Sequence, residues 1–379
     1  MTKIAMVLWH LSDVDTERTG GLERCALTEA RLLSSVGIEV SVAAKEFYGS
    51  PAGYTAQKII PPKLLGSRAS LGYYALFGLR NAFADVYHAH NIPFVAALRP
   101  RRTLVHLNNE VRFPGYSRLK GLYREAHYAC CSRYIRSWLI DSYPELNENQ
   151  VYVLHNAADI ERFRPSDRDS LNSPPRLLFA GQWNERKGIF RLLEAASLLQ
   201  DQGAEFELWI AGSAGLWQSP SEKAVADKTN LDVQNWADKL KNVRIIGLID
   251  HNKMPELYRS VDIMVVPSIW NEPSALTFSE AMGSGLPVIA FSVGGNSEMV
   301  LDGETGFLVK ERTSEALASA ICSLLDRPRR ILSMGQAARA RAEAEFSWQV
   351  HMRRLWSLYI RVNPEMNAHQ FTFDCLGDN

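Results

Sequence analysis

Cysteine is scarce in this chain of 379 residues, which contains only five. They show no metal-ligand spacing, and an odd number does not build a disulfide framework. The adjacent pair Cys130 and Cys131 follows an apolar pattern that is typical of small core side chains. The thiols therefore indicate a reducing cytoplasm and argue against a disulfide-stapled secreted domain.

Long hydrophobic runs are also missing. No segment approaches the ~20 consecutive apolar residues that cross a bilayer. The apolar stretch at residues 4–9 is too short for a signal peptide, and acidic residues follow it. We therefore expect a cytoplasmic protein that does not span a membrane, with peripheral association at the inner face of a membrane left open.

The chain has no net charge, because 42 Lys and Arg balance 42 Asp and Glu, and this argues against a dedicated nucleic-acid binder. The balance is uneven along the chain. Residues 99–136 contain only two acidic residues but nine basic ones: Arg99, Arg101, Arg102, Arg112, Arg118, Lys120, Arg124, Arg133 and Arg136. Such a stretch fits an anionic acceptor or an acidic membrane surface. A solvated positive face explains it equally well.

Short apolar strands alternate with helical patterns along the first part of the chain. Residues 3–8 predict a strand, 22–36 a helix that ends before Gly37, and 38–43 a second strand. Further strands, each followed by a turn and a helical stretch, are predicted at 86–88, 103–106, 127–131 and 151–154. This alternation predicts a parallel sheet covered by helices.

A proline- and serine-rich stretch at residues 162–175 (RFRPSDRDSLNSPP) predicts an interdomain linker. The alternation restarts after it, with strands at 176–179, 205–210, 243–246 and 263–266 and helices at 190–199 and 255–260. The length of the chain also favours about two domains. We therefore predict an α/β protein of two Rossmann-like, doubly wound domains that face each other across a cleft.

The most informative stretch lies at residues 267–309, PSIWNEPSALTFSEAMGSGLPVIAFSVGGNSEMVLDGETGFLV. It sets Glu272 and Glu280 eight positions apart around a predicted helix start, where Pro273 suits the first turn. Eight helical residues rise about 12 Å, roughly the reach from a hexose hydroxyl to a ribose hydroxyl. The N–H groups of the helix start would meet a diphosphate between them. This spacing favours a sugar-nucleotide site over a helix-start acid beside an unrelated surface acid.

Three weaker patterns follow predicted strands. Lys187 lies in the loop AGQWNERKG at residues 180–188, although an isolated lysine there is more often solvated. Gly20 and Gly21 precede a helix, where glycine allows close approach of a ligand but also serves a plain tight turn. His88, His90 and His106 lie at strand ends, where histidine is commonly a satisfied core residue. No spacing of His, Cys or carboxylates builds a zinc site, so no metal site is predicted.

The motif order, with EAMGSGLPVIAFSVGG followed by EMVLDGETGFLV, resembles the retaining glycosyltransferases of the GT-B fold, family 4 (glycosyl transferases group 1). The similarity covers nearly the whole chain and is densest at residues 176–310. It implies an N-terminal acceptor domain at 1–165, a nucleotide-sugar donor domain at 176–345, a helix at 346–362 that packs back on the first domain, and a loose tail at 363–379.

The same resemblance implies roles for individual residues. Glu272 would bond a donor-sugar hydroxyl, Lys187 would stabilise the departing diphosphate, and His106 would contact the donor sugar. Glu280 would hold the ribose hydroxyls, and backbone amides near Ala275 and Leu276 would contact phosphate and sugar. Where the family usually has an arginine and Phe-Gly, this chain has Gln182 and Ser274-Ala275. The full donor set is Gly21, Gln182, Arg186, Ser274, Ala275, Leu276 and Glu280, with Arg186 as the second positive charge.

The resemblance thus implies a retaining hexosyltransferase that moves a hexose-type sugar from a nucleoside diphosphate to an acceptor hydroxyl. The expected partners are the nucleotide-sugar donor and a glycan or lipid-linked acceptor, as in surface polysaccharide or lipopolysaccharide assembly, without nucleic acid. No cofactor or metal ion is expected to be required. A GT-B-fold sugar-nucleotide epimerase and a non-catalytic nucleotide-sugar-binding protein are the alternatives.

Overall fold

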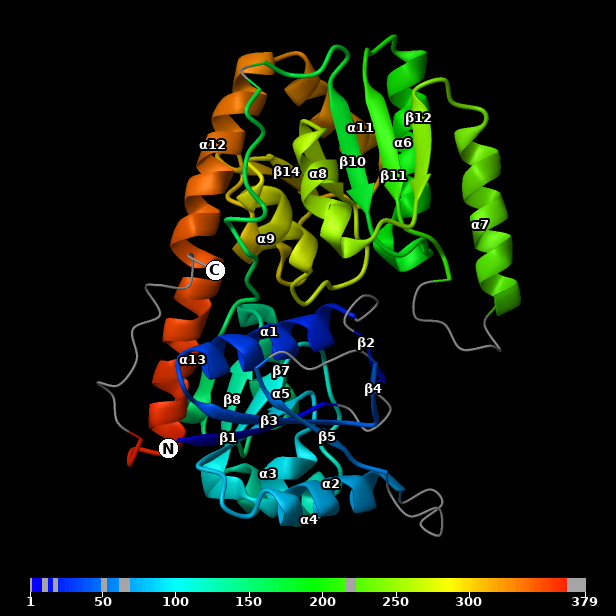
Figure 1. The fold of residues 1–379 in the computed structure, drawn as a ribbon. Helices are drawn as coiled ribbons and strands as arrows, with labels where there is room; N and C mark the ends of the chain where they lie inside the picture. Colours follow the sequence, from blue (N-terminus) through cyan, green and yellow to red (C-terminus); the bar gives the residue numbers. More distant parts are fainter. Residues whose placement is uncertain are drawn as a thin grey trace. The chain divides into compact units, whose positions relative to one another are not determined.

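The computed structural model describes residues 2–8, 13–15, 20–48, 53–60, 69–168, 170–215 and 223–366. The chain divides into two compact units, one formed by residues up to 156 with the segment from 348, and the other by residues 157–347. Each unit is built on one large parallel sheet with helices on its faces (Figure 1). This confirms the predicted class of two Rossmann-like α/β domains.

The sheet of the first unit has seven strands in the order β5-β3-β1-β6-β7-β8-β9, all parallel to their neighbours. Their bounds are β1 (Lys3–Val7), β3 (Glu39–Ala44), β5 (Thr55–Lys58), β6 (Val86–His90), β7 (Thr103–Leu107), β8 (His127–Cys130) and β9 (Val151–Val153). A small two-stranded sheet pairs β2 (Asp13–Asp15) with β4 (Glu46–Tyr48). The register places His90 opposite His106 on the neighbouring strand.

The helices of the first unit are α1 (Gly21–Ser35), α2 (Ala69–Arg80), α3 (Phe94–Leu98), α4 (Tyr116–Tyr123), α5 (Arg133–Ser142) and α13 (Trp348–Val362). Helix α1 buries Ala26, Ala30 and Leu33 at the spacing of one helix face. These side chains share a core with Leu355 and Tyr359 of α13. Helix α13, far along the sequence, therefore completes the core of the first unit.

The second unit has six parallel strands in the order β12-β11-β10-β13-β14-β15. The strands are β10 (Arg176–Ala180), β11 (Glu207–Ala211), β12 (Val243–Gly247), β13 (Ile263–Val266), β14 (Val288–Phe291) and β15 (Gly306–Val309). The helices are α6 (Ile189–Asp201), α7 (Lys223–Ala237), α8 (Met254–Arg259), α9 (Leu276–Gly283), α10 (Asn296–Met299), α11 (Ser314–Leu325) and α12 (Pro328–Glu345).

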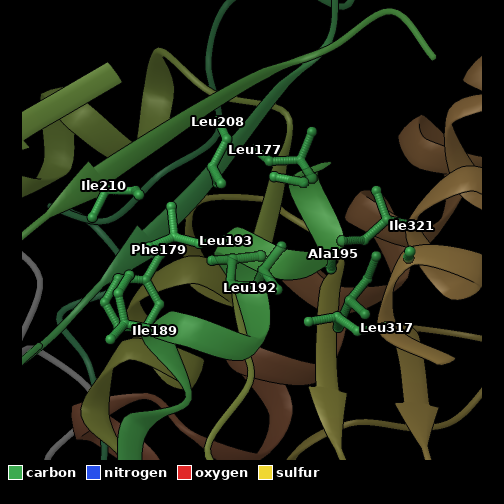
Figure 2. Packing of buried hydrophobic residues seen from close by; sticks show 14 of the residues in the cluster. Leu177, Phe179, Ile189, Leu192, Leu193, Ala195, Leu208, Ile210, Leu317 and Ile321 are labelled. Atoms are coloured by element: carbon green, nitrogen blue, oxygen red, sulfur yellow. The ribbon is translucent and has the colours of Figure 1, made fainter. Parts of the chain in front are cut away.

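Side chains alternate across the central strand β10 of this sheet. Leu177 and Phe179 face a core shared with α6 and α11, in which Leu192 and Leu317 are fully or almost fully buried (Figure 2). Leu178 points to the other face and packs with residues of α8, α9 and α12. Burial of each such side chain contributes about 1.5–3 kcal/mol, so the central strands are held from both faces.

The segment predicted as a linker, residues 162–175, lies along the second unit. The Asp262 carboxylate accepts hydrogen bonds from the backbone N–H groups of Asn172 and Arg176, at 3.2 and 2.7 Å. The Arg168 guanidinium donates to the Val261 carbonyl. Of the predicted tail, residues 367–379 lie outside the described residues.

The helix expected to start near Pro273 begins later, at Leu276. The reason is that the Glu272 carbonyl accepts the Gly295 N–H at 2.7 Å and so does not start a helical hydrogen-bond series. Among the described helices, none is both long enough and apolar enough to cross a membrane.

Candidate functional site

The strand order of the second sheet reverses between β10 and β13, which lie side by side. In open parallel sheets, ligands bind beyond the carboxyl ends of the strands at such a point. The loop after β10 carries Lys187, and the loop after β13 carries Glu272. Two predicted site residues, far apart in sequence, thus reach the same edge of one sheet.

Lys187 and Glu272 are in direct contact, with 2.6 Å between Nζ and Oε2. The same carboxylate oxygen accepts hydrogen bonds from Trp270 Nε1 at 3.0 Å and Ser268 Oγ at 3.1 Å. Glu272 is 5% exposed, and the Lys187 side chain is 27% exposed. Because all three bonds go to Oε2, the other carboxylate oxygen accepts no hydrogen bond from the described residues.

The turn that presents Lys187 is a single 3-10 turn, η4 (Glu185–Lys187), capped by the Asn184 side chain, which accepts the Lys187 N–H at 2.8 Å. Gly188 follows with φ of +73°, and a Cβ placed there would lie 1.8 Å from the Pro267 carbonyl oxygen. The turn is thus packed directly against the start of the loop that carries Glu272. Only glycine fits this contact.

Arg186 lies over the Trp270 indole, with its guanidinium carbon 3.9 Å from the ring centroid. Its carbonyl accepts the Ile269 N–H at 2.9 Å, which ties the two loops together. A guanidinium over an indole face is a favourable cation–π arrangement. Trp270 therefore contacts both Arg186 and Glu272, and it links the second expected positive charge to the lysine–glutamate pair.

Glu280, in the second turn of α9, is 5% exposed and has partners on both carboxylate oxygens. His251 Nε2 lies 3.0 Å from Oε1, and the Tyr258 hydroxyl donates to Oε2 at 3.1 Å. The carboxylate is thus held in one orientation. A diol bound here would share these oxygens with His251 and Tyr258.

The remaining predicted donor residues of the second unit surround the same loops. Ala275 is the extended N-cap of α9 and has no polar side chain to cap the helix, so the start of α9 presents the backbone N–H of Leu276. Ser274, Ala275 and Leu276 are half-buried. Gln182 lies in the loop after β10, where its side-chain amide is 3.4 Å from the Ala214 carbonyl.

Gly21 and His106 belong to the first unit. Gly21 is exposed and is the first residue of α1. His106 is completely buried, with Nδ1 3.6 Å from Glu29 Oε1. The His106 side chain has no exposed surface that a donor sugar could contact in this structure. The contact implied for His106 stays a prediction.

Sequence analysis missed the residues that hold the two acids. Ser268 and Trp270 precede Glu272 by four and two positions, and the alternation of an extended segment could have indicated that Trp270 points the same way. His251 and Tyr258 come from the region of α8, 29 and 22 positions before Glu280. No sequence spacing marks these two.

Two family profiles match the chain in succession. The family described as Glycosyltransferase Family 4 matches residues 19–162, and the family described as Glycosyl transferases group 1 matches residues 163–341. A curated relative, D-inositol 3-phosphate glycosyltransferase 2 of Catenulispora acidiphila, is 32% identical over 239 residues, or 60% of this chain. The match spans 54% of that relative, so the chain covers about half its length.

Solved structures share the fold over nearly the whole chain. Sucrose-phosphate synthase from Thermosynechococcus elongatus matches with a TM-score of 0.76 and 22% identity, over 96% of this chain and 100% of its own. HepE from Anabaena, solved in complex with UDP-glucose, matches with a TM-score of 0.72 and 18% identity, over 97% and 99%. At these identities the likeness concerns the GT-B fold.

Proposed function

This chain belongs to the group 1, family 4 glycosyltransferases of the GT-B fold, and from that premise we propose that it transfers a hexose-type sugar from a nucleoside-diphosphate donor to an acceptor hydroxyl. The observation that carries the proposal is the contact between Lys187 and Glu272 at the switch point of the second sheet. A cation for the diphosphate and an acceptor for a sugar hydroxyl lie side by side there.

The proposed roles follow from the charges. Lys187, with Arg186 beside it and the uncapped start of α9, would hold the diphosphate and stabilise the charge that develops as the sugar leaves. The Oε1 atom of Glu272, not engaged by other described residues, would accept a hydrogen bond from a donor-sugar hydroxyl. Glu280 would bind the ribose diol. These cationic groups support transfer without a metal ion at the diphosphate.

We propose that the anomeric configuration is retained. A retaining glycosidase uses two carboxyl groups about 5–5.5 Å apart, one of them as nucleophile. Here the Glu272 carboxylate is instead bonded to Lys187, Trp270 and Ser268, which favours a positioning role. In the proposed step the bond from the anomeric carbon to the diphosphate oxygen breaks, the acceptor oxygen bonds on the same face, and the departing phosphate oxygen takes the acceptor's proton.

The proposed acceptor is anionic, such as a phosphorylated or lipid-linked glycan of surface polysaccharide assembly. Its support is the basic stretch at residues 99–136. Within it, Arg101 and Lys120 are exposed and form surface ion pairs with Glu125 and Glu145. The remaining basic residues leave this region with a surplus of positive charge, and a polybasic surface attracts anionic lipids and glycans.

The test starts from the purified full chain. Thermal unfolding with UDP-, GDP- and ADP-sugars should identify one donor, since a ligand of the folded state raises Tm according to its excess over Kd. The chosen donor is then incubated with candidate acceptors, and NMR of the product gives the anomeric configuration. Conversion of the donor without acceptor would favour an epimerase. No Tm shift with any donor and no product would reject the proposal.

A further inference from the structure

Four ionisable side chains converge in the interior of the first unit. Glu29 comes from α1, His88 and His90 from β6, and His106 from β7. All four are completely buried, and one candidate ligand atom from each lies within 4.8 Å of the others. None of them takes part in the lysine–glutamate site of the second unit.

The polar atoms of this cluster are poorly satisfied. Six buried atoms have no hydrogen-bond partner among the described residues: Glu29 Oε2, His88 Nε2, both ring nitrogens of His90 and both of His106. Each buried donor or acceptor without a partner has lost its hydrogen bonds to water and gained none in return, which destabilises the fold. These groups are gathered at one point and are not scattered through the core. This concentration indicates that a ligand from outside the chain binds them.

The distances around the carboxylate fit metal coordination better than hydrogen bonding. Glu29 Oε2 lies 3.6 Å from His88 Nδ1 and 3.4 Å from His90 Nε2, and Oε1 of the same carboxylate lies 3.6 Å from His106 Nδ1. These distances exceed the usual hydrogen-bond range. They are close to the ~3.4 Å that separates neighbouring ligands of a tetrahedral ion whose bonds are about 2.0–2.1 Å long.

An outer layer of hydrogen bonds comes from α13. His351 places Nε2 2.9 Å from Glu29 Oε1 and Nδ1 2.8 Å from the His155 carbonyl oxygen. The Tyr359 hydroxyl lies 2.8 Å from His88 Nδ1. Partners that orient the first ligands are a regular part of protein metal sites, and here His351 anchors the carboxylate. The Tyr359 hydroxyl instead occupies the His88 nitrogen that faces Glu29, and it must give up that nitrogen when the ion binds.

We propose that Glu29, His88, His90 and His106 bind one divalent transition-metal ion, best matched by Zn²⁺, as a structural site in the first unit. Three imidazoles and one carboxylate form a four-ligand set of the kind zinc accepts. Complete burial leaves no position open to solvent, which distinguishes a structural from a catalytic site. The ion joins α1 to β6 and β7 and is acquired while the unit folds. His106 then serves the fold in place of the donor contact that the family resemblance implies.

The first experiment measures metal content. The full chain is produced in zinc-supplemented medium, gel-filtered to remove loosely bound ions, and analysed by elemental mass spectrometry. We expect about one zinc per chain, and a loss of at least about tenfold in E29Q and in the double variant H90Q/H106Q. The control H127Q alters a histidine of β8 outside the cluster and should keep its zinc. Y359F should keep it too, since the ion needs His88 Nδ1 free of the tyrosine hydroxyl.

A second measurement does not depend on the variants folding. Wild-type chain is unfolded in denaturant with a chelator, desalted, and refolded with or without Zn²⁺ or Co²⁺. We expect Tm to rise and to saturate near one equivalent, and the Co²⁺ form to show the visible absorption of a tetrahedral site. Wild type that carries less than about 0.1 ion per chain and refolds with an unchanged Tm would overturn the proposal. So would zinc that persists in H90Q/H106Q, because that ion would lie elsewhere.

Discussion

Lys187 Nζ lies 2.6 Å from Glu272 Oε2, although the two residues are 85 positions apart in the sequence. The contact joins the loop after β10 to the loop after β13. It brings a cation and an anion to one sheet edge, where Trp270 and Ser268 fix the anion. Replacing either residue and measuring turnover and folding therefore tests whether the pair is catalytic or structural.

Lys187→Gln and Glu272→Gln should each lower kcat/KM for sugar transfer by about 10²–10³-fold, because each removes a group aimed at charge or a hydroxyl in the transition state. The double variant should lose less than the product of the two losses, since the pair acts as a unit. Glu207→Gln is the control, because Glu207 pairs with Arg176 where β10 and β11 begin. Near-normal turnover in a folded Lys187 or Glu272 variant would contradict the assigned roles.

Glu280→Gln should raise KM for the donor by about tenfold with little change in kcat, because a ribose contact is made equally before and during the reaction. Tyr258→Phe, which removes one hydrogen bond to the same carboxylate, should have a smaller effect in the same direction. Steady-state kinetics with varied donor checks both variants. An unchanged KM in Glu280→Gln would remove ribose binding from its role.

Gly188→Ala should destabilise the fold by at least about 3 kcal/mol, because it adds a steric clash to the usual 1–2 kcal/mol of a left-handed conformation. Gly203 is a matched control. It has φ of +77° and no described atom within 4 Å of an added methyl group, whereas Gly188 has φ of +73° and a carbonyl oxygen at 1.8 Å. Gly203→Ala should therefore cost only about 1–2 kcal/mol. Urea unfolding measures both, and equal losses would show that the turn against Pro267 can relax.

Acid should destabilise the protein partly through His127, which lies at the start of β8. Burial, and then the positive charge of Arg361, lower the pKa of His127 to about 4. Unfolded histidine takes its proton near pH 6.5, so between about pH 6.5 and 4 the unfolded chain binds more protons. Stability is therefore fully present above pH 6.5 and is lost as the pH falls through this window.

The half-buried position of His127 limits this term to about 1–2 kcal/mol, after a reduction for solvent screening. Unfolding measured from pH 7.5 to 4.5 should show a shallower decline in His127→Gln than in wild type. Gln can keep the contact that His127 makes with Gln150. Parallel pH profiles for the two proteins would exclude His127 as a source of the acid sensitivity.

Much of the fold could be predicted because apolar strands and helix faces have local patterns. The predicted strand 263–266 coincides with β13 (Ile263–Val266), which is buried along its whole length. By contrast, β5 (Thr55–Lys58) consists of TAQK and carries no apolar signal, and β4 (Glu46–Tyr48) has only three residues, too few for a recognisable pattern. Such strands form because a neighbouring strand offers hydrogen-bond partners, which the local sequence does not reveal.

The same distinction applies to the candidate site. Lys187 and Glu272 could be predicted because each follows an apolar strand, and parallel strands bring such loops to one edge. The tertiary partners of Glu280 could not, since His251 and Tyr258 arrive from another part of the chain. The burial of Glu29, by contrast, could have been predicted, because it is an acid on the apolar face of α1 between Ala26 and Leu33.

Helix α13 has a consequence for the order in which the protein matures on the ribosome. The second unit is one continuous stretch, whereas the first needs Met352, Leu355 and Tyr359 from far downstream to close its core, and His351 to cover the carboxylate of Glu29. During synthesis the core of the first unit therefore stays incomplete after residue 156, until the 191 residues of the second unit and then α13 have been made. The unit whose synthesis begins first is thus the last to complete its hydrophobic core.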